Sequence, residues 1–429
     1  MVSIGHGTNP ADSGAAGQGG RGMVALVVAL FFVWGFSTVL VDTVIPKLKA
    51  LFSLSFTEVM LTQFSFFIAY FVVSIPAGHL IARIGYMRGI VVGLVIMAAG
   101  GLMFAPAASL GLYPGFLAAL FVLASGITIL QVAANPLIAV LGDPASSHSR
   151  LTLAQAFNSL GTTIGPWVGA ILILKGMAPL PDPQSVTPEV LDALRRTEAH
   201  AVQIPFIGIA VTLLTMAVVF WWLRHWRGAP QSEAADSGHT AFEFLAAHPR
   251  LAFGVLSIFV YVGAEVSIGS VLTNYLMQHD TLGLAPVDAG KLVSFYWGGA
   301  MIGRFVGSGV LRMVSPGKVL AACALGAAAL ASTSALSSGI VAAVTVIAIG
   351  LCNSIMFPTI FSLAIEGLGP NTSRGSGLLC LAIVGGAIIP VMTGAVADTL
   401  GLGLALLVPA ACYLVIAAYG WFARRPAAG

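Results

Sequence analysis

The chain has 429 residues, of which 58% are hydrophobic and only 8% are charged. A water-soluble globule of this length needs more polar surface, so the composition excludes a soluble fold and predicts an integral membrane protein. The formal charge of +3 argues against a nucleic-acid-binding surface, and the four cysteines lie in apolar stretches without disulfide or metal-ligand spacing.

Residues 1–22 are rich in Gly, Ala and Ser and contain no apolar core of a signal peptide, so we expect a disordered cytoplasmic tail. Apolar segments of about 20 residues follow, the length that crosses a bilayer core of about 30 Å. The sequence predicts twelve transmembrane helices, at 23–46, 58–82, 89–107, 115–141, 150–174, 203–224, 251–278, 288–311, 317–336, 339–366, 374–397 and 401–422.

The hydrophilic stretch at 224–250 divides these twelve spans into six and six. We therefore expect an N-terminal six-helix bundle at 23–224, a cytoplasmic linker at 225–250 and a C-terminal six-helix bundle at 251–424. Lysine and arginine are more frequent in the loops on the side of the N-terminus, which favours two cytoplasmic termini and insertion in the cell inner membrane.

The two halves repeat each other weakly but in register. The run from Gly78 to Arg83 matches the run from Gly307 to Arg312, and GTTIGP ending at Pro166 matches GGAIIP ending at Pro390. Two pseudo-symmetric six-helix bundles built from such parallel repeats resemble the fold of major facilitator transporters, in which substrate binds between the halves. The basic turn GHLIARIGYMR also resembles a loop motif of that superfamily, although Ala82 replaces its usual aspartate.

Ionisable residues inside a span cost about 2.5–3.5 kcal/mol and are rarely present without a role. Asp42 shares a helix face with Trp34 and Thr38, and Glu265 shares one with Tyr261, so we interpret both acids as proton-coupling candidates. For Arg304 we favour a topological or helix-packing role, with pairing to a carboxylate as the alternative.

Side-chain amides are concentrated in the fourth and fifth spans. Gln131 and Asn135 share one helix face, and Gln155, Asn158 and Thr162 share another. Such amides either bond helix to helix or bind a polyol such as a sugar, because they offer both donors and acceptors. Aromatic rings that could stack on a sugar are Trp34, Phe157, Tyr296, Trp297 and Phe357.

The segments FFVWGFSTVLVDTVIPKLKALF, LQVAANPLIAVLG and SRLTLAQAFNSLGTTIGP resemble the fucose:proton symporter family of the major facilitator superfamily. The resemblance implies that Asp42 is the family's acid of the first span and that Gln155 and Asn158 contact sugar. Gln131 stands where the fucose branch has a proton-carrying glutamate, so the resemblance favours the glucose, galactose and mannose branch.

The sequence thus predicts a secondary active transporter that imports a neutral hexose (glucose, galactose or mannose) by proton symport through alternating access. We expect a monomer in the lipid bilayer, with a monosaccharide and a proton as its ligands and with no enzymatic activity, cofactor, metal or nucleic acid. The alternatives are a proton-independent uniporter, a fucose or N-acetylhexosamine symporter and, more remotely, a non-transporting membrane sensor. The candidate substrate residues are Trp34, Thr38, Gln131, Asn135, Gln155, Asn158, Thr162, Tyr261, Tyr296, Trp297 and Asn353.

Overall fold

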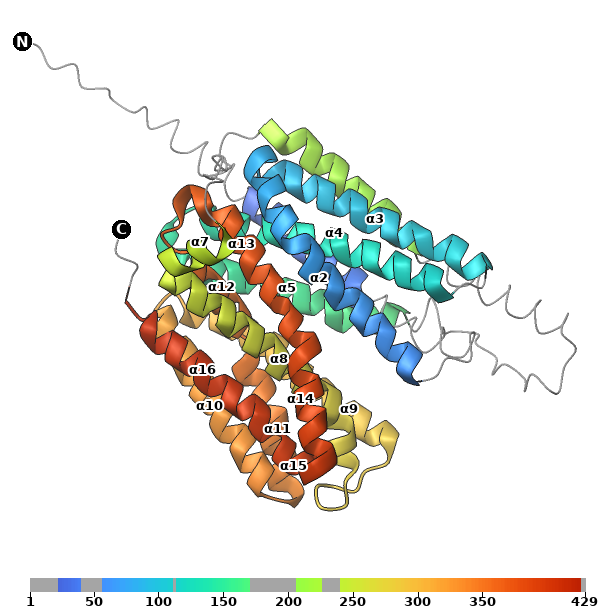
Figure 1. Cartoon of the computed structure of the whole chain (residues 1–429), viewed down its shortest axis with the longest axis vertical. Helices are drawn as coiled ribbons and strands as arrows, with labels where there is room; N and C mark the ends of the chain where they lie inside the picture. The colour runs from blue at the N-terminus through green and yellow to red at the C-terminus, as the bar shows by residue number, and fades with distance from the viewer. Residues whose placement is uncertain (1–21, 40–55, 111–112, 170–205, 226–239, 426–429) are drawn as a thin grey trace, which may run out of the picture.

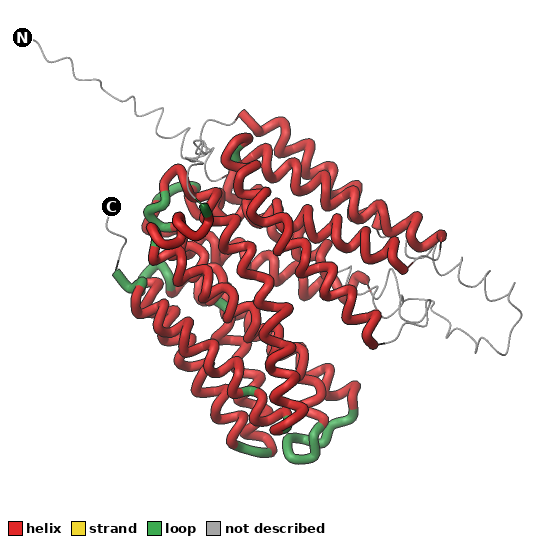
Figure 2. Tube along the Cα trace, viewed as in Figure 1, coloured by secondary structure: helices red, strands yellow, loops and turns green. Residues whose placement is uncertain are grey.

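The computed structural model describes residues 22–39, 56–110, 113–169, 206–225 and 240–425 (Figure 1). Within these ranges the chain forms helices, turns and short connections and no strand (Figure 2). The all-α prediction is therefore confirmed.

The helices fall into two groups that lie side by side in Figure 1. The first helix group consists of Gly22–Val39, α2 (Phe56–Ile84), α3 (Tyr86–Leu110), α4 (Tyr113–Val140), η1 (Pro144–Ser146), α5 (Ser147–Gly169) and Phe206–His225. The second helix group consists of α7 (Ala241–Ala247), α8 (Pro249–Met277), α9 (Pro286–Val310), α10 (Pro316–Leu336), α11 (Gly339–Asn353), α12 (Met356–Ile365), η4 (Gly369–Asn371), α13 (Thr372–Leu381), η5 (Ala382–Val384), α14 (Gly385–Leu400), α15 (Leu402–Ala405) and α16 (Leu407–Phe422).

Ten of the described helical segments are long and apolar enough to cross a membrane. The helices α5, with 23 residues, and α9, with 25, coincide with predicted spans but are too polar to belong to that set. These two helices pack against each other across the two groups. Polar side chains at this contact, such as Ser159 of α5 and Arg304 of α9, are thereby kept in the interior, where they bond to each other.

Three predicted spans are not continuous helices. The span at 339–366 is α11 followed by α12, with a break at 354–355, the span at 374–397 is α13, η5 and α14, and the span at 401–422 is α15 followed by α16. At the first break Pro358 has no N–H group, so the Ser354 carbonyl lacks its helical donor four residues on.

The predicted linker at 225–250 contains α7, which opens with a capping box. Thr240 Oγ1 accepts from the Glu243 N–H at 3.2 Å, and Glu243 Oε2 accepts from the Thr240 N–H at 2.7 Å. A helix this short needs such caps, because it forms few internal hydrogen bonds.

We call the end of the molecule that holds His225 and Ala241 the linker end. There the two groups approach at backbone level: a Cβ atom on Gly377 of α13 would lie 2.8 Å from Ser74 O and 3.3 Å from Gly78 Cα of α2. Ser376 Oγ also donates to Val132 O at 3.0 Å. That carbonyl is free within α4, because Pro136 cannot donate to it.

Three further hydrogen bonds join the groups near the linker end through α5. His148 Nδ1 lies 2.6 Å from Ser362 Oγ, and Ser149 Oγ donates to Ser308 O at 2.6 Å while accepting from Arg312 Nε at 2.9 Å. The two groups are thus held together at this end by directional polar bonds as well as by glycine packing.

The packing of α3 on α4 generates a first prediction. A Cβ atom on Gly126 would lie 2.3 Å from Met97 N and 2.8 Å from Gly93 O, so Gly126→Ala forces the two helices apart. Overpacking of this kind costs about 1–3 kcal/mol. We expect a lower midpoint of thermal unfolding in detergent. Gly208→Ala is the control, because no atom of the described residues lies within 4 Å of its Cβ position; equal midpoints for the two variants would contradict the close approach of α3 and α4.

Candidate functional site

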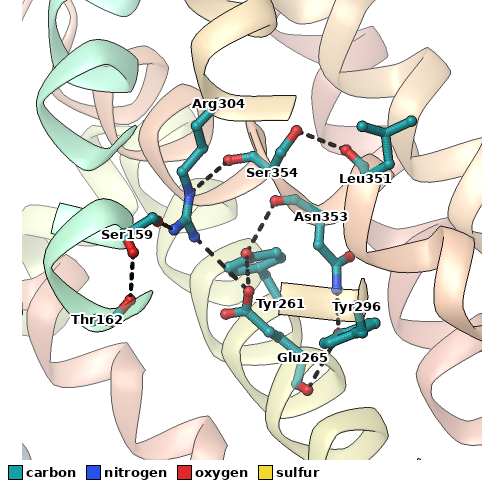
Figure 3. Close-up of polar contacts among 9 residues, drawn as sticks. All are labelled: Ser159, Thr162, Tyr261, Glu265, Tyr296, Arg304, Leu351, Asn353 and Ser354. Atoms are coloured by element: carbon teal, nitrogen blue, oxygen red, sulfur yellow. Dashed lines mark hydrogen bonds and ion pairs between the residues drawn. The ribbon is translucent and has the colours of Figure 1, made fainter. Parts of the chain in front are cut away.

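The carboxylate of Glu265 lies inside the second helix group, on α8 (Figure 3). Its Oε1 atom accepts from the Tyr261 hydroxyl at 2.9 Å and lies 4.0 Å from a terminal nitrogen of Arg304 on α9. The Glu265 and Arg304 side chains are each only 15% exposed, so water screens this ion pair weakly. Glu265 is therefore a charged group held between one neutral donor and one cation.

Arg304 connects the two helix groups. Its Nε atom donates to Ser354 O at 3.1 Å, and its guanidinium also donates to Ser159 Oγ on α5 of the first group. The Ser354 carbonyl is available because Pro358 leaves it without a helical donor. We predicted a topological or helix-packing role for Arg304, with pairing to a carboxylate as the alternative; the structure shows the pairing with Glu265 together with contacts between helices, because α9 turns this residue toward α5 and α8.

The residues around Glu265 form a continuous network from α8, α9 and α11. Asn353 Nδ2 donates to the Tyr296 hydroxyl at 2.8 Å, and the Tyr261 hydroxyl lies 3.1 Å from Asn353 O. All three of these side chains are buried. The structure thus brings together Tyr261, Glu265, Tyr296 and Asn353, four of the residues predicted for the site.

A second polar cluster lies in the first helix group. Gln131 Nε2 donates to the Tyr70 hydroxyl of α2 at 2.6 Å, and Gln155 Nε2 lies 3.5 Å from Asn135 Oδ1. The Nδ2 atom of Asn135 is buried and has no hydrogen-bond acceptor among the described residues. An amide donor without a protein acceptor, beside two further amides, suits a ligand that carries hydroxyl groups.

Tyr70 and Ser159 were not predicted as members of the site. Tyr70 is a polar-tipped residue within the apolar run of α2 and is buried, and Ser159 lies one residue after Asn158. A buried tyrosine hydroxyl needs a partner, which was the available signal for Tyr70. No comparable signal in the sequence pointed to Ser159, because its partner Arg304 is more than a hundred residues away in the chain.

Three of the predicted substrate residues make contacts within or between helices. Asn158 Nδ2 donates to Phe31 O at 3.0 Å, Thr162 Oγ1 donates to Ser159 O at 2.9 Å and Thr38 Oγ1 donates to Trp34 O at 2.9 Å. The sequence left open whether these amides join helices or bind a sugar. The Asn158 amide nitrogen joins two helices. Its Oδ1 atom keeps its capacity to accept.

The aromatic candidates differ in exposure and partners. Trp34 is buried and its ring centroid lies 5.2 Å from that of Phe31, whereas Trp297 is 45% exposed and packs edge-on against Tyr296. Phe157 lies edge-on against Phe305 of the second group. Phe357 stacks on Phe361.

Two further predictions concern charged and metal-binding groups. Asp42, the second proton-coupling candidate, lies outside the described residues. In the described parts of the chain, no three His, Cys, Asp or Glu side chains come close enough together to hold a metal ion.

Comparison with known proteins gives consistent matches over nearly the whole chain. A family model of the Major Facilitator Superfamily matches residues 25–390. A glucose/galactose transporter of Brucella abortus is 49% identical over 96% of this chain and 97% of its own length. An L-fucose-proton symporter of Escherichia coli is 36% identical over 94% of this chain and 93% of its own.

Among solved structures, the transporter FucP in the outward conformation superimposes with a TM-score of 0.86 and 34% sequence identity. The match covers 93% of this chain and 98% of that one. The resemblance noted from the sequence motifs is therefore confirmed over the full length of the helical region.

The network around Asn353 generates a second prediction. Tyr296→Phe removes the oxygen that accepts from Asn353 Nδ2 and leaves a buried amide donor unpaired. Loss of such a bond costs about 1–3 kcal/mol. We expect a lower thermal midpoint in detergent, whereas in an Asn353→Leu background the same change should have little effect. Additive effects of the two substitutions would show that this hydrogen bond does not form.

Proposed function

The chain belongs to the Major Facilitator Superfamily of transporters, and we propose that it imports glucose or galactose together with protons. The observation that carries this proposal is a bridge between the two helix groups: Arg304 of the Glu265 network contacts Ser159 on α5, the helix that also carries Gln155 of the amide cluster. A solute bound between the clusters would contact both groups. Its exchange between the two sides of the membrane then requires the groups to tilt relative to each other.

The amide cluster supports a sugar as the substrate. Gln131, Asn135 and Gln155 are neutral, offer donors and acceptors together, and are buried where water cannot compete. The Brucella abortus relative is named for glucose and galactose, and Gln131 stands where the resemblance gives the fucose branch a titratable acid. Mannose fits the same chemistry, and fucose or N-acetylhexosamine transport are the alternatives within the family.

The ion pair of Glu265 and Arg304 supports coupling to protons. A proton on Glu265 removes the negative charge that faces Arg304 and so changes how strongly the guanidinium is held on its own helix group. The same guanidinium bonds to Ser159 of the other group, so protonation alters a contact between the groups. We assign Asp42 a second proton-linked role on the strength of the family resemblance.

The proposal includes the arrangement of the protein in the membrane. The first bundle comprises residues 23–224 and the second residues 251–424, joined by a cytoplasmic linker, with both termini in the cytoplasm of a cell inner membrane. The excess of lysine and arginine on the linker side supports this orientation. The protein acts as a monomer and transports its substrate chemically unchanged.

Purified protein in liposomes tests this function. Counterflow of labelled glucose and galactose reports exchange whether or not protons are coupled. Addition of either sugar to a weakly buffered suspension should raise the external pH, because symport removes external protons. Exchange without any change of pH would replace symport by uniport, and the absence of exchange for every hexose and for fucose would overturn the proposed function.

Substitutions of the two acids test the proton role. Glu265→Gln and Asp42→Asn keep the shape of each side chain but cannot release a proton. We expect each to abolish sugar accumulation driven by a pH gradient while counterflow persists. Asp288→Asn is the control, since Asp288 is an exposed acid paired with Lys291. A Glu265→Gln protein that still concentrates sugar would remove Glu265 from the coupling mechanism.

A further inference from the structure

A cavity of about 860 Å³ lies between the two helix groups at the linker end. Its wall comes from α3, α4, η1 and α5 on one side and from α8, α10, α12, η4, α13 and the residues 423–425 after α16 on the other. This volume is typical of a binding site for a small organic molecule. Arg250 in its wall precedes Glu265 by 15 residues of α8, about 22 Å along the helix axis. The cavity is thus separate from the polar network described above.

Four helices begin at this cavity: α5, α8, α10 and α13 place Ser147, Arg250, Pro316 and Thr372 in its wall. None of the four has an acidic residue in its first turn, and the residues that precede α8, α10 and α13 make no side-chain capping bond. Helix starts carry unpaired N–H groups and a partial positive charge. The starts of these four helices therefore each contribute a positive electrostatic potential inside the cavity.

The opposing negative charges are already neutralised. Arg150 donates to Ile138 O at 3.2 Å and to Ala139 O at 2.8 Å, which satisfies the end of α4. Arg250 donates to Ala423 O at 3.4 Å and binds Glu366 at 2.5 Å, and Glu366 is the one carboxylate among the described lining residues.

Two of the cationic side chains in the wall are those of Arg250 and Arg425. Arg250 lines the cavity, and its Nε atom, which has no acceptor in the described part of the chain, is fully buried beneath the surface of the wall. The side chain of Arg425 is exposed at the cavity. Both are cationic donors of the kind that bind phosphate.

His148 supplies a complementary acceptor from the first helix group. The Ser362 hydroxyl donates to Pro358 O at 2.7 Å, so its oxygen accepts from His148 Nδ1–H at 2.6 Å. This fixes the tautomer and leaves Nε2 with a lone pair. A phosphate monoester, which loses its second proton near pH 6, can donate to such a nitrogen while its other oxygens accept from arginine.

We propose that this cavity binds a phosphate-bearing anion that contacts both helix groups. His148 belongs to α5, and Arg250 and Arg425 belong to the second group, so one ligand between them holds the linker end closed. The cavity is large enough for an organic substituent in addition to the phosphate. Such a ligand can be a soluble phosphate monoester or the monoester headgroup of a lipid such as phosphatidic acid.

Binding to the purified full-length protein in detergent tests the site without reference to transport. The probes are glucose 6-phosphate, inorganic phosphate and, in nanodiscs, phosphatidic acid, whose headgroup is a phosphate monoester, with glucose as the uncharged control. We expect saturable binding of at least one phosphate probe and a rise of the thermal midpoint with its concentration. Saturation by glucose 6-phosphate or phosphate identifies a soluble ligand, and stabilisation by the lipid alone identifies a headgroup.

Substitutions at the exposed Ala145 of η1 give a matched pair. Ala145→Glu places a carboxylate at the wall, and Ala145→Gln adds a neutral side chain of the same size. We expect Ala145→Glu to weaken phosphate binding about tenfold or more and Ala145→Gln to leave it nearly unchanged. Arg425→Gln should weaken binding by about the same factor as Ala145→Glu, because it removes a charge-assisted bond. Arg83→Gln, which removes an exposed arginine outside the cavity, should have no effect.

The proposal is overturned if no phosphate probe binds, or if Ala145→Gln and Arg83→Gln weaken binding as much as Ala145→Glu. A further measurement rests on the proposed transport function: the bound probe, supplied at the linker side of liposomes, should slow counterflow in the native protein and not in Ala145→Glu. Binding without any counterflow would leave the site established and refute the transport assignment alone.

Discussion

The hydrogen bond from Arg304 to Ser159 is the constraint on which the central part of the structure depends. A guanidinium inside a membrane protein needs acceptors, and Arg304 finds them in a carboxylate and a free carbonyl of its own helix group and in a hydroxyl of the other. Because these acceptors lie on α8, in the break between α11 and α12 and on α5, the side chain fixes these three segments relative to α9.

The linker end depends on small residues and on prolines. Gly78 and Gly377 let α2 and α13 touch at the backbone, and the serines of α5 and α13 add directional bonds. Dispersion contacts between backbones are weak singly and are lost together when the helices separate. An interface of this composition can be firm without large interlocking side chains, which would resist a tilt of the two groups.

The fold was largely predictable from the sequence, because length and hydropathy determine spans directly. All twelve predicted spans have a helical counterpart, although the long segment at 339–366 gave no warning of its break beyond the presence of Pro358. The site was predictable where spacing on one helix carried the signal, as for Tyr261 and Glu265. It was not predictable where two residues meet only through tertiary packing, as for Ser159 with Arg304 or Gln131 with Tyr70. Helical periodicity contains no information on which helices are neighbours.

The bond from Ser376 to Val132 has a consequence for the way in which the two groups separate. When the two groups separate, the hydrogen bond from Ser376 to the Val132 carbonyl breaks. Pro136 has no N–H group, so it cannot take the place of Ser376 as the donor to that oxygen. A water molecule must take the vacated position for the oxygen to remain hydrogen-bonded. Separation of the two groups at the linker end therefore requires entry of water as well as rotation of the groups. Its rate should depend on the activity of water on that side of the membrane.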